Sequence, residues 1–245
     1  MSLRITGATA VRVLSQLRRD PRTIALLLAV PALLIVLLKY VLEGSPAAFN
    51  RIGGPLIGLF PFITMFLVTS IAMLRERTSG TLERLLTMPL AKLDLLLGYG
   101  IAFALMAALQ AGIVAAVGLG ALGIDVAGSV WLVVLLAIAN AILGMALGLF
   151  VSAFATTEFQ AVQFMPAIVL PQLLLCGLFV ARDQMARALE IASYALPLTY
   201  AYDALERVTL TNIVDRYLVR DIVVIAGATL LALGLGAATL RRRTP

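Results

Sequence analysis

The sequence has no histidine, one cysteine and few charged residues. Lys, Arg, Asp and Glu make up 13% of the 245 residues, whereas hydrophobic residues make up 62%, and the mean hydropathy is +1.04. The single cysteine, Cys176, cannot form a disulfide within the chain, and a His/Cys metal cluster is excluded. A soluble domain of this size has too little interior for so many apolar side chains, so lipid must surround most of the chain.

An internal source of energy is also missing. The pair Gly-Lys never occurs, so a phosphate-binding P-loop is excluded. We expect spans two to six to hold no charge inside their ends, with Asp221 at the edge of the last span, whereas a proton-coupled transporter usually buries Asp, Glu or His in its spans. A membrane enzyme would need a nucleophile, a carboxylate pair or a metal cluster. A stand-alone channel or secondary transporter and a membrane-embedded enzyme therefore stay as alternatives to a transport subunit driven by a partner.

Long uncharged runs predict six spanning helices, because a charge at the bilayer centre costs about 2.5–3.5 kcal/mol on insertion scales. Roughly 20 apolar residues are enough to cross. We expect an all-α membrane protein that forms one transmembrane domain over residues 1–245. Its spans should cover about 24–42, 54–74, 95–120, 131–153, 160–181 and 221–240.

The basic residues indicate the topology. Six spans place both termini on one side, and 12 of the 19 Lys and Arg residues lie in the short segments of that side. Short cytoplasmic segments are enriched in Lys and Arg. Both termini are therefore expected in the cytoplasm, and the net charge of +6 reflects topology rather than binding of nucleic acid.

Two regions outside the spans have helical patterns. Residues 3–19 predict an amphipathic helix in the cytoplasmic interface, with Arg12, Gln16 and Arg19 turned away from its apolar face. That face is formed by Ala10, Val13, Leu14 and Leu17. Residues 184–210 alternate charges with apolar stretches, which makes them too polar to cross and too apolar to float free. They predict a short re-entrant or interfacial helical hairpin on the outer side.

Small residues recur at a spacing of four in two spans. They are Asn140, Gly144 and Gly148 in the fourth span, and Gly112 and Gly120 in the third. Small residues on one helix face permit close approach of another helix, and an amide can hydrogen-bond across the contact. We expect packing within the chain, with an oligomer interface as the alternative.

Spans two and five carry more polar and aromatic side chains than the other spans. Glutamine is seldom found facing lipid, and proline in these spans bends a helix. We therefore expect this group to line a transport path or to face a partner subunit. Its members are Phe62, Thr64, Phe66, Thr69, Gln163, Phe164 and Gln172.

The segment that follows span two has the pattern of a docking element. Ser79-Gly80 can end the preceding helix, and Thr81 can cap a new one. Leu82 and Leu85 then share one face, while Glu83 and Arg84 point outward. A generic cytoplasmic loop would be merely basic, whereas this segment is capped, amphipathic and mixed in charge, as suits a contact with another protein.

Two motifs resemble the ABC-2 type permease family, the membrane subunits of ATP-binding-cassette exporters. The first is ERTSGTLERLL over residues 76–86, followed by Met88-Pro89, and the second is LPLTYAYDAL over 196–205. The resemblance extends over nearly the whole chain, from the amphipathic helix to the basic tail.

The resemblance implies a subunit of a drug or lipid exporter in the cytoplasmic membrane of a bacterium. Residues 76–88 would be a coupling helix on a separate ATPase subunit, present in two copies, which binds ATP and Mg²⁺. The chain itself would hold no cofactor and would pair with a second permease copy, so that spans two and five surround the path. The implied ATPase contacts are Glu76, Arg77, Leu82, Glu83, Arg84, Leu85 and Glu158.

Overall fold

The computed structural model of the chain describes residues 3–79 and 92–239, and all regular elements in these ranges are helical. Six helices are long and apolar enough to cross a membrane, which confirms the all-α membrane fold. They are Pro21–Val41, Pro46–Thr78, Leu97–Ala121, Val130–Phe154, Glu158–Leu175 and Arg216–Ala238.

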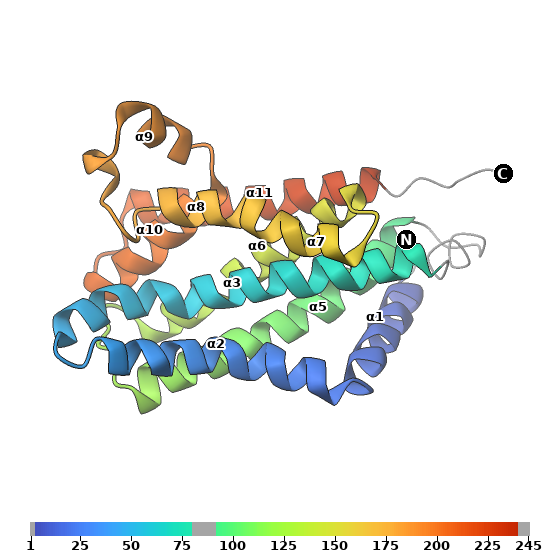
Figure 1. Cartoon of the computed structure of the whole chain (residues 1–245), viewed down its shortest axis with the longest axis horizontal. Helices are drawn as coiled ribbons and strands as arrows, with labels where there is room; N and C mark the ends of the chain where they lie inside the picture. The colour runs from blue at the N-terminus through green and yellow to red at the C-terminus, as the bar shows by residue number, and fades with distance from the viewer. Residues whose placement is uncertain (1–2, 80–91, 240–245) are drawn as a thin grey trace.

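The long helices run along the long axis of the molecule (Figure 1). The elements are α1 (Leu3–Arg18), α2 (Pro21–Val41), α3 (Pro46–Thr78), α5 (Lys92–Ala115), α6 (Val130–Val151), α7 (Glu158–Phe164), α8 (Leu170–Leu175), α9 (Arg187–Ser193), α10 (Pro197–Leu210) and α11 (Arg216–Ala238). Helix α5 continues into a π-helical turn, Ala116–Ala121, and α6 into a 3-10 turn, Ser152–Phe154. Another π-helical turn, Met165–Val169, joins α7 to α8, and a 3-10 turn, Arg182–Gln184, precedes α9.

The bundle has two different ends. Helix α1, the last turn of α3, the start of α7 and the last turn of α11 lie together at one end, called here the terminal end (Figure 1). The opposite end, called the far end, holds the α2–α3 turn and the α9–α10 region. The six spans therefore begin and finish on the same side, as their even number requires.

The centre of the bundle is the contact between α3 and α6. Gly144 lies so close to the carbonyl of Phe62 that a Cβ there would overlap it, and Gly148 meets the carbonyl of Phe66 and the hydroxyl of Thr69 in the same way. Thr69 also donates to the Met145 carbonyl at 3.2 Å. The glycine spacing in α6 therefore serves packing within the chain.

The glycines of α5 and its π-helical turn have a similar spacing but do not form a close helix contact. A Cβ at Gly112 or Gly120 would have no atom within 4 Å, so neither glycine takes part in close packing among the described residues. Ala116, which lies between them, is exposed. In α5 the close approach occurs instead at Gly98, where a Cβ would lie 2.5 Å from the Cβ of Thr9 in α1.

Helix α1 packs on α5 through the apolar face that its sequence predicts, since Ala10 and Val13 are buried. The prediction that Arg12 turns away is wrong. Its guanidinium donates to the Tyr99 hydroxyl of α5 and stacks over the Tyr99 ring at 5.5 Å from the centroid. The long arginine side chain lets α1 keep an apolar contact while its charge reaches across to α5.

Helix α2 is peripheral and is tied to the bundle by a polar side chain from α5. Pro31 has no N–H, so the carbonyl of Leu27, four residues earlier, has no helical donor. The Gln110 amide nitrogen donates to this carbonyl at 2.5 Å and to the Thr64 hydroxyl of α3 at 2.6 Å. One buried side chain thus connects three helices.

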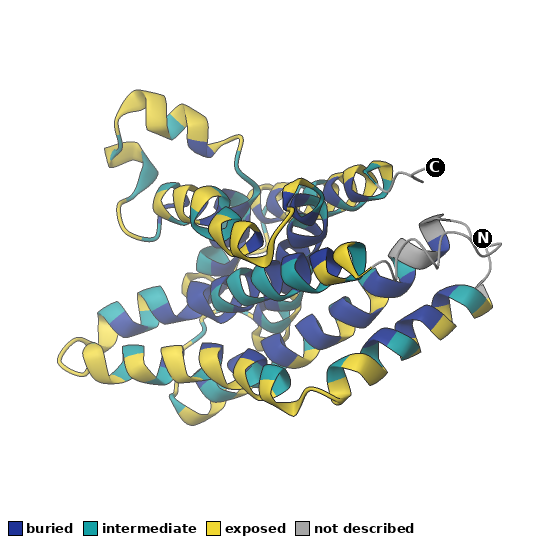
Figure 2. Ribbon diagram, turned by 45° about the vertical axis from the view of Figure 1, so that its right-hand side comes forward, coloured by how far each residue is buried: buried dark blue, intermediate teal, exposed yellow. Residues whose placement is uncertain are grey.

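The surface of the bundle matches a lipid environment. Leu26, Leu33 and Leu37 of α2 and Leu230 and Leu231 of α11 are exposed apolar residues. Figure 2 shows the buried residues gathered in the central helices, with exposed residues along the periphery. A belt of exposed leucine is expected where lipid replaces water, so the chain is a multi-pass membrane protein.

The fifth span is interrupted. The π-helical turn contains Pro166, and Pro171 follows at the start of α8, so regular helical hydrogen bonding fails twice. The helix ends at Leu175, although the sequence predicts a span to residue 181. Gly177 then adopts φ +108, a conformation that favours glycine, and turns the chain toward α9.

The last span starts earlier than its sequence predicts. Asp215 caps α11 by accepting a hydrogen bond from the Leu218 N–H at 3.0 Å, so the helix begins at Arg216. Asp221 therefore lies inside the helix and is fully buried. Its carboxylate accepts from the Arg220 guanidinium at 2.7 and 2.9 Å. The expectation of charge-free spans does not hold for this helix.

Helix α10 does not cross the bundle but packs into its far end. A Cβ at Gly58 of α3 would lie 2.5 Å from a methyl carbon of Leu205, so glycine lets α10 approach closely. The Ala127 and Gly128 N–H groups donate to the carbonyls of Thr209 and Val208 at 2.9 and 3.1 Å. These backbone bonds fix the end of α10 to the segment before α6.

Candidate functional site at the terminal end

Three consecutive residues in the last turn of α3 contact four other helices. Glu76 lies 3.8 Å from the Arg12 guanidinium of α1, next to Tyr99 of α5. Arg75 pairs with Glu158 at the start of α7. Arg77 donates to the Thr239 hydroxyl beyond α11 at 3.5 Å. The segment that follows α3 therefore begins at a junction of α1, α5, α7 and α11.

The contact between Glu76 and its neighbours is shielded from solvent and incompletely paired. The Glu76 side chain is 13% exposed, and its second carboxylate oxygen has no hydrogen-bond partner among the described residues. Arg12 is shared between this carboxylate and the Tyr99 hydroxyl. A charge in this position responds strongly to small movements of its neighbours, because a shielded carboxylate depends on the few partners that it has.

The pair formed by Arg75 and Glu158 has a different character. The guanidinium donates twice to the carboxylate, at 2.7 and 3.0 Å, and the two side chains are 61% and 54% exposed. Glu158 also lies next to Thr157, whose hydroxyl caps α7 by accepting from the Gln160 N–H. The two-point geometry fixes the relative position of α3 and α7, while exposure keeps its energy small.

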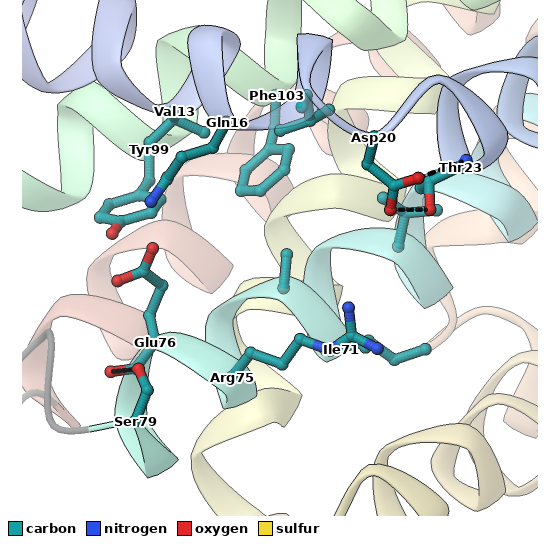
Figure 3. A pocket seen from close by; sticks show the side chains of 13 residues that line it. Val13, Gln16, Asp20, Thr23, Ile71, Arg75, Glu76, Ser79, Tyr99 and Phe103 are labelled. Atoms are coloured by element: carbon teal, nitrogen blue, oxygen red, sulfur yellow. Dashed lines mark hydrogen bonds between the residues drawn. The ribbon is translucent and has the colours of Figure 1, made fainter.

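A cavity of about 440 Å³ opens between α1, α2, α3 and α5 at this end. In Figure 3 the Tyr99 hydroxyl and the Gln16 amide point toward the Glu76 carboxylate, and Asp20 lies on the opposite side. Asp20 caps α2 and accepts from the N–H and hydroxyl of Thr23 at 3.1 and 2.6 Å. These hydrogen bonds hold the pKa of Asp20 below its usual value, so its carboxylate stays ionised near neutral pH.

The predicted coupling residues fall into two groups. Glu76, Arg77 and Glu158 lie at the junction just described. The predicted contacts of the 76–88 segment beyond Ser79 lie outside the described residues; they are Leu82, Glu83, Arg84 and Leu85. The role of all these residues in binding an ATPase subunit stays a prediction.

The residues predicted to line a path in span two lie inside the chain's own bundle. Phe62, Phe66 and Thr69 are buried against α6, and Thr64 accepts the Gln110 hydrogen bond. In span five, Gln163 is exposed and Phe164 is half-buried. Gln172 is buried and donates to the Ile168 carbonyl at 3.1 Å. In this conformation, packing accounts for the span-two residues, and Gln163 is the one left facing outward.

A second cluster of charges lies at the far end. The Arg182 guanidinium contacts the Asp203 carboxylate of α10 at 2.5 Å, with the two side chains 22% and 11% exposed. The Tyr202 hydroxyl donates to Glu206 at 2.8 Å. Burial raises the pKa of Asp203 to about 6, although Arg182 opposes this shift. This cluster joins α10 to the segment after Gly177.

Sequence reasoning missed Tyr99 and Gln110, which both connect helices. Gln110 is a lone amide in an apolar run, and the proline in span one was a signal that some carbonyl needs a donor. Nothing in the sequence pairs that carbonyl with this particular amide. Nothing in the sequence indicated a role for Tyr99, because its partner Arg12 was expected to point away from the apolar face of α1.

Comparison with known proteins agrees with the motifs. The family model described as "ABC-2 type transporter" matches residues 6–210. This match extends from α1 to the end of α10 and therefore includes the junction at the terminal end.

Curated relatives carry related names. The "Probable multidrug ABC transporter permease YbhR" of Escherichia coli K12 is 29% identical over 157 residues, which are 64% of this chain and 43% of the relative. "Probable multidrug ABC transporter permease YbhS" of the same organism is 24% identical over 178 residues, 72% of this chain and 47% of the relative. "ABC transporter G family member 20" of Dictyostelium discoideum is 22% identical over 158 residues, 64% of this chain and 22% of the relative. The chain thus aligns with less than half the length of each relative.

Proposed function

Because this chain belongs to the ABC-2 type transporter family, we propose that it is the membrane subunit of an ABC exporter. The exporter moves a drug-like or lipid-like substrate across the cytoplasmic membrane of a bacterium, and the related permeases that are named for multidrug transport support this class of substrate. Work is supplied by two copies of a separate ATPase subunit that bind ATP and Mg²⁺, while this chain forms the path together with a second permease copy.

The observation that supports this proposal best is the junction at the last turn of α3. Glu76, Arg75 and Arg77 contact α1, α7 and the end of α11 from three successive positions. A force applied to the 76–88 segment would therefore reach α1, α5, α7 and α11 at once. Rigid helices joined at one point can convert a small displacement into a change between inward-open and outward-open arrangements.

The charge distribution supports the proposed orientation. In the sequence, 12 of the 19 Lys and Arg residues precede the first span, lie between spans two and three, or follow the last span, so the positive-inside tendency places the terminal end in the cytoplasm. In that orientation α9 and α10 lie on the outer side, and the last turn of α3, from which the 76–88 segment continues, lies on the side of a cytoplasmic ATPase.

The proposal is tested by co-purification and charge reversal. The tagged chain, extracted from its native membrane, should bring down a P-loop ATPase, and Glu83→Arg should abolish transport while ATP hydrolysis by the complex continues. This uncoupling is expected because Glu83 is one of the proposed contacts with the ATPase subunit, and reversal of its charge would disturb that contact. Export is followed with a fluorescent drug in inverted vesicles.

The matched control is Glu43→Arg, the same charge reversal in the exposed turn at the far end. This variant should transport normally. Unchanged transport in a strain without the partner ATPases would refute the proposal. Transport driven by an ion gradient in ATP-free liposomes would favour a stand-alone transporter instead.

A further inference from the structure

The cavity at the terminal end has the size and walls of a site for a small organic molecule. Its volume of about 440 Å³ lies within the roughly 300–1,000 Å³ of known ligand pockets. Apolar side chains from α1, α3 and α5 form most of the wall, with the Tyr99 and Phe103 rings on one side. Such a wall favours the body of an apolar or aromatic molecule.

The charges that line the cavity are mainly negative. Asp20 and Glu76 are its two carboxylates, and Glu76 has one oxygen without a partner among the described residues. Arg75 also lines the cavity, but its guanidinium is bound at two points to Glu158. Arg12 compensates Glu76 only in part, since it lies 3.8 Å away and donates to Tyr99.

This lining contrasts with its surroundings. The terminal end is otherwise rich in exposed arginine, including Arg18, Arg19 and Arg22 around the α1–α2 turn. An anion or an anionic lipid headgroup would meet those arginines at the surface, whereas a molecule inside the cavity meets carboxylates and aromatic faces. Carboxylates and aromatic faces both attract cations.

We propose that the cavity between α1, α2, α3 and α5 binds organic cations that carry an apolar or aromatic body. The assignment rests on the proposed function, since it names the charge class of an exported substrate. The cavity lies at the cytoplasmic end of the proposed topology, and its floor is the α3 turn that carries Glu76. A bound cation would therefore contact the residue through which movement of the 76–88 segment passes to α1.

Binding is tested on the purified chain without any ATPase, in nanodiscs of zwitterionic lipid. The probe is tetraphenylphosphonium, and tetraphenylborate is its counterpart of nearly equal shape and opposite charge. Equilibrium dialysis against empty nanodiscs removes the contribution of the bilayer. Tetraphenylphosphonium should bind saturably, and tetraphenylborate should neither bind saturably nor displace it.

Substitutions then locate the site. Asp20→Asn removes the charge but keeps a side chain that can cap α2. Glu76→Gln removes the charge of the other carboxylate and keeps the size of its side chain. Each should weaken tetraphenylphosphonium binding about tenfold, and the double variant should weaken it further. Ala72→Leu, which fills the cavity from α3, should abolish binding without any change of charge. Thermal unfolding and gel filtration establish that each variant is folded.

The matched control is Glu190→Gln, which removes a carboxylate from the far end and should leave affinity unchanged. Equal binding of both probes, or unchanged affinity in the Asp20→Asn/Glu76→Gln variant, would overturn the assignment. Loss of tetraphenylphosphonium binding when the ATPase subunit is added would identify the cavity as a docking surface for that subunit. This result would also overturn the assignment. These measurements leave the co-purification result untouched, so failure of this assignment is separate from failure of the proposed function.

Discussion

The two ends of the bundle use their charges differently. At the far end, Arg182 and Asp203 are mostly buried and contact each other, and Asp221 of α11 is fully buried beside Arg220. At the terminal end, Arg75 and Glu158 are more than half exposed, and a cavity separates α1 from α3. The far-end pairs are thus shielded by contacts within the chain, although a cavity of about 320 Å³ opens beside Arg182 and Asp203, whereas the pair at the terminal end is exposed.

The largest change in stability is expected when the ion pair at the far end is removed. Arg182→Ala removes the cationic partner of a carboxylate that is only 11% exposed. Breaking a shielded pair from one side leaves an uncompensated charge, so we expect the free energy of unfolding to fall by about 3 kcal/mol. Thermal unfolding of the detergent-purified chain at pH 7.5, followed by tryptophan fluorescence, measures the change.

Arg75→Ala is the matched variant at the terminal end, because it breaks a two-point arginine–carboxylate pair that is exposed. Its cost should be about 0–1 kcal/mol. Equal losses in the two variants would contradict the distinction between a shielded and an exposed ion pair.

A smaller change is expected in the pH dependence of stability, which tests the burial of Asp203 at the far end. The pKa of Asp203 is about 6 in the folded chain, above its ordinary value of 3.8. The folded state therefore binds this proton more tightly than the unfolded chain, so the contribution is fully present below pH 3.8 and is lost as the pH rises through 6. Its full size is about 3 kcal/mol, and roughly half of this free energy develops between pH 7.5 and pH 5.

The measurement compares the native chain with Asp203→Asn between pH 7.5 and 5. The native chain should gain stability relative to the variant as the pH falls. The charges that act on Asp203 are Arg182, Glu206 and Asp221, and they are present in both proteins. Parallel stability curves for the two proteins would show that Asp203 is not buried as the structure has it.

Much of the fold could be predicted because lipid imposes a simple rule. A spanning helix excludes most charge over about 20 residues, so uncharged runs were enough to predict six helices able to span a membrane. The α6 glycines could likewise be predicted to pack. The α5 glycines at positions 112 and 120 have the same spacing but meet no neighbour, because spacing describes one helix and says nothing about what lies opposite.

Other features depend on contacts between distant segments. Pro31 indicated an unpaired carbonyl, but only the fold brings the Gln110 amide to it. Asp221 was placed at the edge of a span because hydropathy alone cannot show that Asp215 caps the helix five residues earlier. Phe62, Phe66 and Thr69 of α3 could be recognised as facing a protein surface, but the sequence could not show whether that surface is α6 of the same chain or a transport path.

The junction at the terminal end was partly predictable. The resemblance to the permease family singled out Glu76, Arg77 and Glu158 as contacts of an ATPase subunit. The sequence did not indicate that Arg75 bonds Glu158, since 83 residues separate them in the chain. It also gave no sign of the cavity, which needs four helices to form.

The central claim is that a separate ATPase subunit engages the chain through the 76–88 segment, and site-directed cross-linking tests it most directly. The native Cys176 is buried, and burial raises the pKa of its thiol to about 11, so it stays protonated and unreactive. A cysteine introduced by Glu83→Cys is then the reactive thiol for a short cross-linker in native membranes, and Glu190→Cys places one at the far end. The account predicts that Glu83→Cys cross-links to a P-loop ATPase and Glu190→Cys does not. Cross-linking from position 190 but not from position 83 would contradict it.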